Sequence, residues 1–214
     1  MNQEELHSFL DFKSKQYESV SFIAQDPIQI PHQFSKKNDI EVAAFLSATI
    51  AWGNRVSILK SAKKMMDLMD ASPYDFVINH QKKDFKTLNS FVHRTFNGQD
   101  LIYFISSLKN IYLNHGGLER LFSSPKINIQ DRIHHFKKTF FELDYLNRTQ
   151  KHISDPQKGS AAKRINMFLR WMVRSNEKGV DFGIWNKISP SELSIPLDVH
   201  TGNVARKLGL LNRR

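Results

Sequence analysis

The amino-acid sequence predicts an all-α protein built around a buried central helix. Apolar residues recur at the three- and four-residue spacing of amphipathic helices along most of the chain, and no segment shows a convincing run of strand-type alternation. The 214 residues are 40% hydrophobic and include 16 Phe and 3 Trp, which is enough apolar material for a sizeable interior. The length fits one large domain or two small lobes that share a core, since domains usually contain about 100–200 residues.

The first predicted elements are an amphipathic helix over residues 3–16 and an irregular connector over 18–37. The connector contains the segment DPIQIPH, whose two prolines interrupt regular structure. A helix capped by Asn38 or Asp39 then extends to about Trp52 and is apolar on almost every side. A helix with that distribution is buried, so this one is predicted to lie at the centre of the fold.

Glycine, asparagine and proline mark the boundaries of the next helices. Gly53 ends the central helix, and Asn54 is a suitable cap for a helix over 55–69. Ser72 and Pro73 open a short helix, with proline at its first position. Further helices are predicted over 99–114, 117–122 and 129–146.

The clearest amphipathic helix is predicted over 159–175, after a polar loop over 147–158. Its apolar residues share one face, and Lys163, Arg170 and Arg174 lie on the opposite face at offsets of 7 and 11 residues. One side therefore packs on the core, while the other presents a row of cations. The chain then continues through turns over 182–193 to a last helix over 200–208.

Positive charge is concentrated in the last third of the chain. The net charge is +10, and residues 146–214 contribute +8 of it, with 13 Lys and Arg against 5 Asp and Glu. A local basic surface is typical of proteins that bind polyanions, nucleic acid first and anionic membranes second. Gly159 and Ser160, at the start of the basic helix, add backbone N–H groups that can bind a phosphate. A solvated basic face and an ordinary helix start are the alternatives.

Residues 195–211, IPLDVHTGNVARKLGLL, carry the most informative motif. They resemble the VDTHVxRVxxRLGL segment of the helix-hairpin-helix DNA glycosylase superfamily, which includes endonuclease III and the 8-oxoguanine glycosylases. The shared residues are Asp198, His200, Val204, Leu208, Gly209 and Leu210. The resemblance assigns the catalytic carboxylate to Asp198, and His200 could contact a DNA phosphate. A plain helix N-cap at Asp198 and a structural role for His200 are the alternatives.

Two further regions extend the resemblance over nearly the whole chain. The segment FLSATIAWGNR, residues 45–55, is similar to the early LSAQ helix of the superfamily, with Thr49 in place of Gln. The resemblance places Trp52, Asn54 and Arg55 near the base pocket or the gap in the DNA, and core packing is the alternative for Trp52. Together with DPIQIPH, SPYDF and KGSAAKRINMFLRWMVR, these segments look like an uncharacterised bacterial family distantly related to the glycosylases.

The resemblance also implies a catalytic lysine at the start of the basic helix. Lys163 is the first choice, because an archaeal 8-oxoguanine glycosylase branch has a lysine at a similar distance from its aspartate, and Lys158 is the second. If neither lysine reaches the pocket, Asp198 would act through water. The residues expected to bind DNA are Lys158, Gly159, Ser160, Arg164, Arg170, Arg174 and His200.

Cofactors and membrane segments are not expected. The chain has no cysteine, which excludes a thiolate-bound iron–sulfur cluster. His134 and His135 are adjacent on a predicted helix and do not share a face, so we expect no metal site there. The most apolar run is shorter than the roughly 20 residues that a bilayer requires, and the acidic start does not resemble a signal peptide. We therefore expect a soluble cytoplasmic protein, associated with the nucleoid in a bacterium.

The expected fold is one glycosylase-like domain over residues 1–214 with two helical lobes. Residues 38–146 form one lobe, and residues 1–37 with 147–214 form the other. Members of the bacterial family continue with a helix after LGLL, so this chain is expected to be truncated at its C-terminus. The expected function is excision of damaged or modified bases from double-stranded DNA, with lyase activity through a lysine Schiff base. The alternatives are a non-catalytic nucleic-acid-binding module of the same fold and a protein that binds anionic membranes or acidic proteins.

Overall fold

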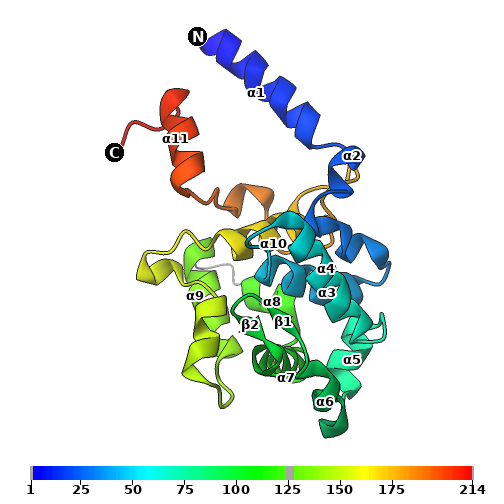
Figure 1. Ribbon diagram of the computed structural model, residues 1–214. Coiled ribbons are helices and arrows are strands. Elements are labelled where there is room, and N and C mark those ends of the chain that lie inside the picture. The colour runs from blue at the N-terminus through cyan, green and yellow to red at the C-terminus, as the bar shows by residue number, and fades with distance from the viewer. Residues whose placement is uncertain (1, 124–127, 214) are drawn as a thin grey trace.

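The computed structural model describes residues 2–123 and 128–213, and helices account for nearly all of their regular structure. The all-α prediction is therefore confirmed, with one short hairpin as an exception. Other helices surround α3 (Lys37–Thr49), which lies in the body of the molecule (Figure 1). The specific arrangement of a helix-hairpin-helix glycosylase stays a prediction.

α-Helices and short 3-10 helices alternate along the described residues. The α-helices are α1 (Gln3–Tyr17), α2 (Val20–Ile23), α3 (Lys37–Thr49), α4 (Arg55–Asp67), α5 (Pro73–Asn79), α6 (Phe85–Leu88), α7 (Gly98–Asn114), α8 (Leu118–Phe122), α9 (Ile129–Phe140), α10 (Lys163–Val173) and α11 (Val199–Lys207). The 3-10 helices are η1 (Pro27–Gln29), η2 (Pro31–Gln33), η3 (Lys82–Asp84), η4 (Asn147–His152), η5 (Pro156–Lys158) and η6 (Pro190–Glu192). The predicted bounds of α1, α4, α7, α8 and α11 are confirmed to within about two residues at each end.

α3 is the central helix because it is buried on nearly every side. Residues 40–49 are all buried, and the ring of Phe45 contacts rings from α7, α9 and α10 at centroid distances of 5.6 to 5.9 Å. The predicted cap of α3 is wrong. Lys36 holds the N-cap position without a side-chain bond, and Asp39 Oδ1 instead accepts a hydrogen bond of 3.0 Å from the Tyr74 N–H.

The hairpin of β1 (Val92–His93) and β2 (Phe96–Asn97) has no counterpart in the sequence prediction. Its two strands pair antiparallel. Strands of two residues are too short to show the alternating pattern that identifies a strand. Burial of His93 and Phe96 holds the hairpin against the body, and Arg94 adopts a left-handed backbone with φ 54° in its turn.

Three predicted helices are shorter than expected, and α3 is one of them, since it ends at Thr49 with Ile50 as its C-cap and not near Trp52 and Gly53. α9 ends at Phe140, whose carbonyl accepts hydrogen bonds from the hydroxyls of Tyr103 and Ser107 at 2.8 and 2.6 Å. These hydroxyls satisfy a carbonyl that has no partner within the helix, so the helix can end there. α10 begins at Lys163, later than predicted, since Ala162 has a left-handed backbone with φ 44°.

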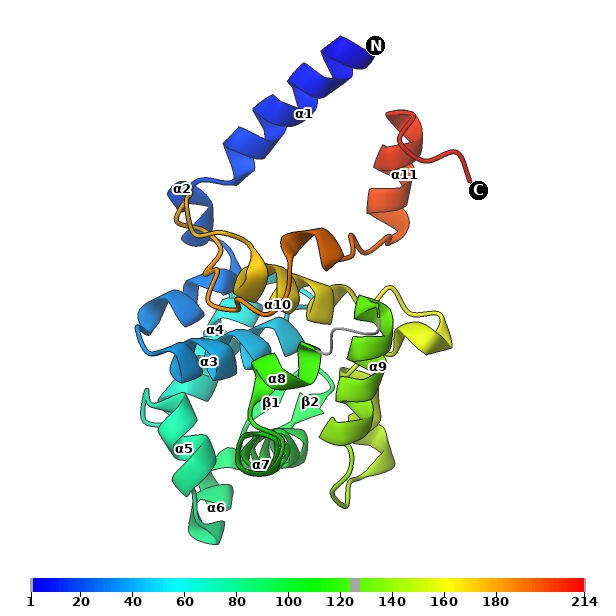
Figure 2. The same ribbon diagram turned by 180° about the vertical axis from the view of Figure 1, so that it is seen from behind.

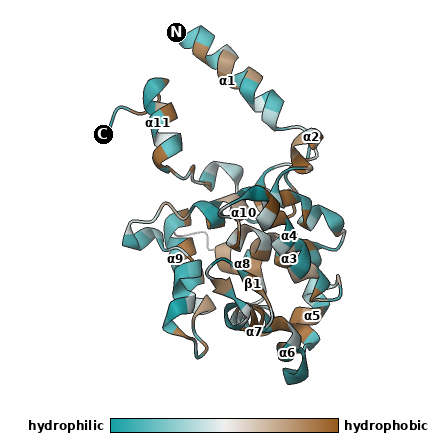
Figure 3. Cartoon of the chain, viewed as in Figure 1, coloured by the Kyte–Doolittle hydropathy of each residue, from teal (hydrophilic) through white to brown (hydrophobic). Residues whose placement is uncertain are grey.

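α1 and α11 project from the same side of the body (Figures 1 and 2). α1 has no buried residue, and Gly202 is the only buried residue of α11. Figure 3 shows hydrophobic residues grouped in the body around α8, whereas hydrophilic and hydrophobic residues alternate along α1. The two projecting helices therefore add little to the core.

The division into two lobes stays a prediction. α3 and α10, which the sequence places in different lobes, pack extensively against each other. Among the described residues, no helix has the length and apolar character needed to cross a membrane.

Candidate functional site

Lys163 and Asp198, which lie 35 residues apart in the sequence, form an ion pair. Lys163 is the first residue of α10, and Asp198 is the N-cap residue of α11. The Lys163 Nζ donates a hydrogen bond of 2.5 Å to Asp198 Oδ2. Asp198 Oδ1 accepts a hydrogen bond of 2.8 Å from the Thr201 N–H, so the helix cap that was the alternative role for Asp198 is present. The structure thus brings together the two residues to which the resemblance assigns catalysis.

The ion pair is open to solvent and carries opposite charges. The side chain of Lys163 is 61% exposed and that of Asp198 is 27% exposed. The hydrogen bond from Lys163 and the one from the Thr201 N–H hold the pKa of Asp198 well below its usual range. Asp198 is therefore a carboxylate at neutral pH.

Lys163 forms part of the wall of a cavity of about 630 Å³, which we call the α10 cavity. One face of α10 lines it with residues at helical spacing: Lys163, Asn166, Met167, Arg170, Trp171 and Arg174. Most of its remaining wall comes from the N-terminal segment and from the chain after η6: Phe22, Asp26, Ile28, Leu193, Ser194, Ile195 and Pro196. The volume suits a small organic ligand, since such sites occupy about 300–1,000 Å³.

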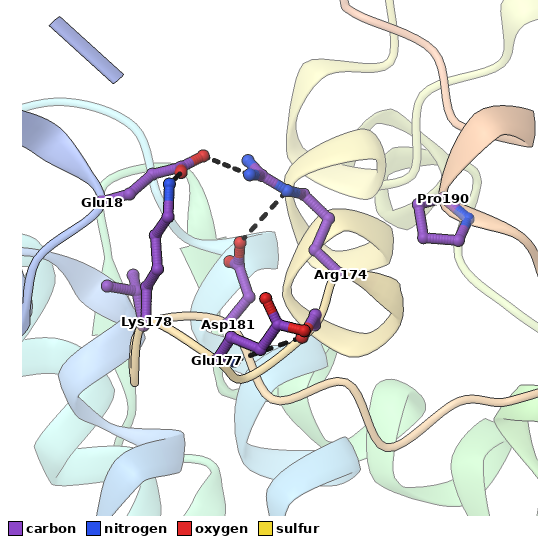
Figure 4. Close-up of a pocket in the computed structure, with 8 residues that line it drawn as sticks. Glu18, Arg174, Glu177, Lys178, Asp181 and Pro190 are labelled. Atoms are coloured by element: carbon purple, nitrogen blue, oxygen red, sulfur yellow. Dashed lines mark hydrogen bonds and ion pairs between the residues drawn. The ribbon is translucent and has the colours of Figure 1, made fainter. Parts of the chain in front are cut away.

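An ion-pair cluster lies beside a second cavity of about 320 Å³ (Figure 4). Glu18 accepts hydrogen bonds from Arg174 and from Lys178, whose Nζ is 2.5 Å from Glu18 Oε2. Burial raises the pKa of Glu18, but the bonds from Lys178 and Arg174 outweigh burial and lower it to about 2. Asp181 Oδ2 accepts a hydrogen bond of 3.2 Å from Arg170 and lies 3.7 Å from the Nε of Arg174. The row of cations on α10 is thus largely neutralised, and contacts of Arg170 and Arg174 with DNA stay a prediction.

Arg164 is half-buried and packs against the end of α3. Its guanidinium donates to the Thr49 carbonyl, and its central carbon lies 4.7 Å from the ring centroid of Trp52. Burial lowers the pKa of Arg164. The structure therefore gives Arg164 a packing role that the sequence did not predict, and its contact with DNA is untested.

Trp52 lies half-buried among two histidine rings. The ring centroids of His93 and His152 are 5.2 and 5.9 Å from that of Trp52, which supports the packing alternative for this residue. Asn54 caps α4 as predicted, since its side chain accepts backbone hydrogen bonds of 3.0 and 3.3 Å. Arg55 is exposed at the start of α4. A place for these residues in a base pocket or DNA gap stays a prediction.

Asp100 is a fully buried carboxylate that the sequence prediction missed. Its oxygens accept hydrogen bonds from the Arg148 guanidinium at 3.0 Å and from the Thr149 hydroxyl at 2.8 Å, and His152 Nε2 lies 3.3 Å away. The only local signal is the spacing of Asn97 and Asp100, which form a capping box at the start of α7. The cluster joins α7 to η4 through buried polar contacts.

The N–H groups of Gly159 and Ser160 are already bonded within the chain and are not free as predicted, so a phosphate contact at these residues stays a prediction. The Gly159 N–H donates to the Pro156 carbonyl at 2.9 Å, and the Ser160 N–H donates to the Asp155 carbonyl at 3.3 Å. Gly159 has φ 78° and ends η5, so it does not begin the basic helix.

Two other residues of the predicted DNA surface are accessible. Lys158, at the end of η5, and His200, in the first turn of α11, are both exposed, as contacts with phosphates require. Within residues 2–123 and 128–213, no three His, Cys, Asp or Glu side chains are grouped so that they could hold a metal ion.

The fold and the site define a mainly α-helical protein with a lysine–aspartate pair beside a cavity. The model of a family described as "Protein of unknown function (DUF2400)" matches residues 26–214, and the chain belongs to this family. The matched region includes both Lys163 and Asp198. No curated protein and no solved structure matches the chain.

Proposed function

We propose that the protein binds double-stranded DNA and cleaves the N-glycosidic bond of a damaged or modified base, with Lys163 and Asp198 as the catalytic pair. One observation carries this proposal: the Lys163 Nζ and Asp198 Oδ2 lie 2.5 Å apart, beside a cavity of the size that small organic ligands occupy. The resemblance of residues 195–211 to the helix-hairpin-helix glycosylases favours the same pair. A DNA substrate implies a protein of the cytoplasm, associated with the nucleoid.

Each member of the pair has a role that its chemistry can supply. Cleavage of the N-glycosidic bond builds positive charge on the sugar, which the negatively charged Asp198 stabilises. Lys163, as a free amine after giving a proton to solvent, attacks C1′ while the bond to the base breaks, and the base leaves with the bonding electrons and takes up a proton from solvent. The resulting adduct opens to a Schiff base between Lys163 and the sugar.

Exposed polar side chains next to the pair can hold the DNA during this reaction. Lys158 and His200 lie within five residues of Lys163 and Asp198, respectively, and both are exposed. The target nucleotide has to be flipped out of the stack, at a cost of a few kcal/mol. Contacts between these side chains and the DNA phosphates would offset that cost.

A non-catalytic DNA-binding module of the same fold is the second candidate. The ion pair itself favours it, because the pairing occupies both of the groups that catalysis would need.

Release of free base from duplex oligonucleotides, each with one lesion, separates the two candidates. We expect release from at least one lesion, and a rate at least about 100-fold lower in Asp198→Asn. Asparagine is also a good N-cap, so this variant should keep α11 and bind DNA to within about threefold. Asp144→Asn, the same change at an exposed aspartate, should keep the full rate. DNA binding without release from any lesion would contradict the enzyme and support the binding module.

A further inference from the structure

One face of α9 and the chain that follows it border a cavity of about 370 Å³, which we call the α9 pocket. α9 and its C-cap residue contribute side chains at the spacing of one helical face: His134, Lys137, Lys138 and Phe141. The following chain contributes Tyr145, Gln150, Asp155 and Lys158. None of these eight residues lines the α10 cavity, so the α9 pocket is a separate site.

Three lysines give the α9 pocket its positive charge. Lys138 and Lys158 are exposed and make no ion pair with the part of the chain that the structure describes. Lys137 is half-buried, and its Nζ donates to the carbonyls of Ile153 and Gln150 at 2.7 and 3.5 Å. An ammonium group has three N–H donors, so Lys137 keeps one for a ligand.

One carboxylate, that of Asp155, lies in the same wall. It is 5% exposed, and its Oδ1 accepts hydrogen bonds from His134 Nδ1 at 3.0 Å and from the Gln157 N–H at 3.1 Å. Burial raises the pKa of Asp155, but these bonds outweigh burial and lower it, so Asp155 is charged at neutral pH. With three lysines against one carboxylate, the wall has a net charge of +2, counting His134 as neutral.

Charged groups next to the α9 pocket do not remove this excess. Asp144 and Lys151 are both exposed on the adjoining loop and contribute one charge of each sign. Asp131 and Glu142, near the two ends of α9, already accept hydrogen bonds from other side chains. An anion in the pocket therefore meets more positive than negative charge.

The charges of Lys137 and Lys158 repel each other. Burial lowers the pKa of Lys137, Asp155 raises it, and Lys158 lowers it further. An anion bound among the lysines relieves this repulsion. Phosphate suits the place because its oxygens can accept charge-assisted hydrogen bonds from several ammonium groups at once.

The other end of the α9 pocket is aromatic. Phe141 lies about one helical turn after Lys137, and Tyr145 follows it. The Tyr145 side chain is 37% exposed, its hydroxyl accepts a hydrogen bond of 2.5 Å from Gln150 Nε2, and its ring centroid lies 5.1 Å from that of Phe141. A ring that is fixed and yet accessible is a platform on which a base can stack.

We propose that the α9 pocket binds a nucleotide, with the phosphate on Lys137, Lys138 and Lys158 and the base on Tyr145. The cationic end matches the charge of the phosphate, and the aromatic end matches the flat ring of the base. Bases within a duplex are stacked on one another and cannot reach Tyr145. The ligand is therefore a free nucleotide or an unpaired nucleotide of a strand.

Calorimetric titrations of the full chain test both ends of the site. The probes are deoxyadenosine monophosphate, deoxyadenosine, which lacks the phosphate, and inorganic phosphate, which lacks the base. We expect the monophosphate to bind at least about tenfold more tightly than either of the other two. No binding of the monophosphate, or equal binding of the monophosphate and either other probe, would overturn the proposal.

Two variants assign binding to the two ends. Lys138→Gln removes an exposed charge, and Tyr145→Leu removes the aromatic ring but keeps an apolar side chain. We expect each to weaken binding of the monophosphate by about five- to tenfold. Lys151→Gln, the same change on the adjoining loop outside the wall, should weaken it by less than about twofold. Wild-type binding by both folded variants, or an equal loss in Lys138→Gln and Lys151→Gln, would show that the assignment is wrong.

Competition separates the two sources of the nucleotide. Displacement of the monophosphate by single-stranded DNA, but not by duplex DNA, would assign the α9 pocket to unpaired nucleotides of a strand. Displacement by neither would assign it to free nucleotides. Displacement by duplex DNA as strong as that by single-stranded DNA would overturn the contact with the base.

The nucleotide site goes beyond the proposed function and does not depend on it, because Lys163 and Asp198 do not line the α9 pocket. Nucleotide binding by a protein that releases no base from any lesion would refute the glycosylase and keep the nucleotide site. Base release by a protein that binds the monophosphate no better than phosphate would refute only the nucleotide site.

Discussion

At the scale of single residues, burial controls the charge of His152. The side chain is 2% exposed and contacts the rings of Trp52 and Phe96. Burial lowers the pKa of His152 to about 4, although the nearby carboxylate of Asp100 acts in the opposite direction. His152 is therefore neutral in the folded protein at pH 7, whereas in the unfolded chain it takes up a proton near the ordinary value of 6.5.

The free energy of unfolding should fall as the pH drops from about 6.5 to about 4, because His152 binds a proton in this range only in the unfolded chain. The contribution is at most about 3 kcal/mol. His152→Phe keeps an aromatic ring and should remove this part of the pH dependence, as measured by urea unfolding across that range. His135→Phe, at an exposed position of α9, is the control. Identical pH dependence in the wild type and His152→Phe would contradict this account.

Sequence patterns predict the role of a residue best when that residue contacts near neighbours in the chain. Asn54 caps its helix as predicted, and Asp198 has the cap that was its alternative role, since a cap bonds to N–H groups two or three residues away. Arg164 is different, because the Thr49 carbonyl that it contacts belongs to another helix. The pairing of Lys163 with Asp198 spans 35 residues, and no spacing rule predicts it. Only the resemblance to the glycosylases indicated that pair.

At the scale of elements, Glu18 joins the N-terminal segment to the end of α10. It is the C-cap residue of α1 and pairs with Arg174 and Lys178. Glu18→Gln should free Lys178 and leave Arg174 with Asp181 as its remaining carboxylate, and it should raise the affinity for duplex DNA by about three- to fivefold, measured by fluorescence anisotropy. Glu4→Gln removes the same charge from an exposed position of α1 and should change the affinity less. Equal effects of the two variants would show that net charge alone, and not the pairing, sets the affinity.

α3 and α1 should differ sharply in their contribution to stability. Phe45 of α3 is fully buried, so Phe45→Ala should lower the free energy of unfolding by about 3–5 kcal/mol. Phe12 of α1 is 63% exposed, so Phe12→Ala should change the free energy of unfolding by less than about 0.5 kcal/mol. Chemical denaturation of both variants measures the difference. A similar loss of stability in both variants would mean that α1 packs against the body in solution.

Helix bounds follow from the sequence only where the end signal is local. Asn54 and Pro73 mark the starts of α4 and α5 as predicted. The end of α9 is set by the hydroxyls of Tyr103 and Ser107, which come from α7, so the helical spacing of residues 141–146 is misleading. The hairpin of β1 and β2 is likewise too short for its pattern to identify it.

At the scale of the whole molecule, the net charge of +10 overstates the positive charge available to a partner. Several cations of the C-terminal third are paired with carboxylates: Arg148, Lys163, Arg170, Arg174 and Lys178. The sequence predicts the fold class and the basic segment from composition and periodicity. The α10 cavity could not be predicted in the same way, because distant segments of the chain form its walls.

This pairing sets the expected salt dependence of DNA binding. The logarithm of the affinity should fall linearly with the logarithm of the salt concentration, with a slope no steeper than about −7, because five of the 13 cations of residues 146–214 are paired with carboxylates. If all 13 cations of residues 146–214 contacted phosphates, the slope would be about −12. Titrations at several salt concentrations measure it. Binding to anionic vesicles without binding to DNA would instead favour the membrane-binding alternative.

The claim that Lys163 is the nucleophile is tested most directly by reductive trapping. The protein is incubated with duplex DNA that carries a lesion or an abasic site, borohydride reduces the Schiff base, and mass spectrometry of peptides locates the adduct. We predict an adduct on Lys163 that is lost in Lys163→Gln and retained in Lys158→Gln. An adduct on any other lysine, or no adduct with any of these duplexes, would contradict the claim.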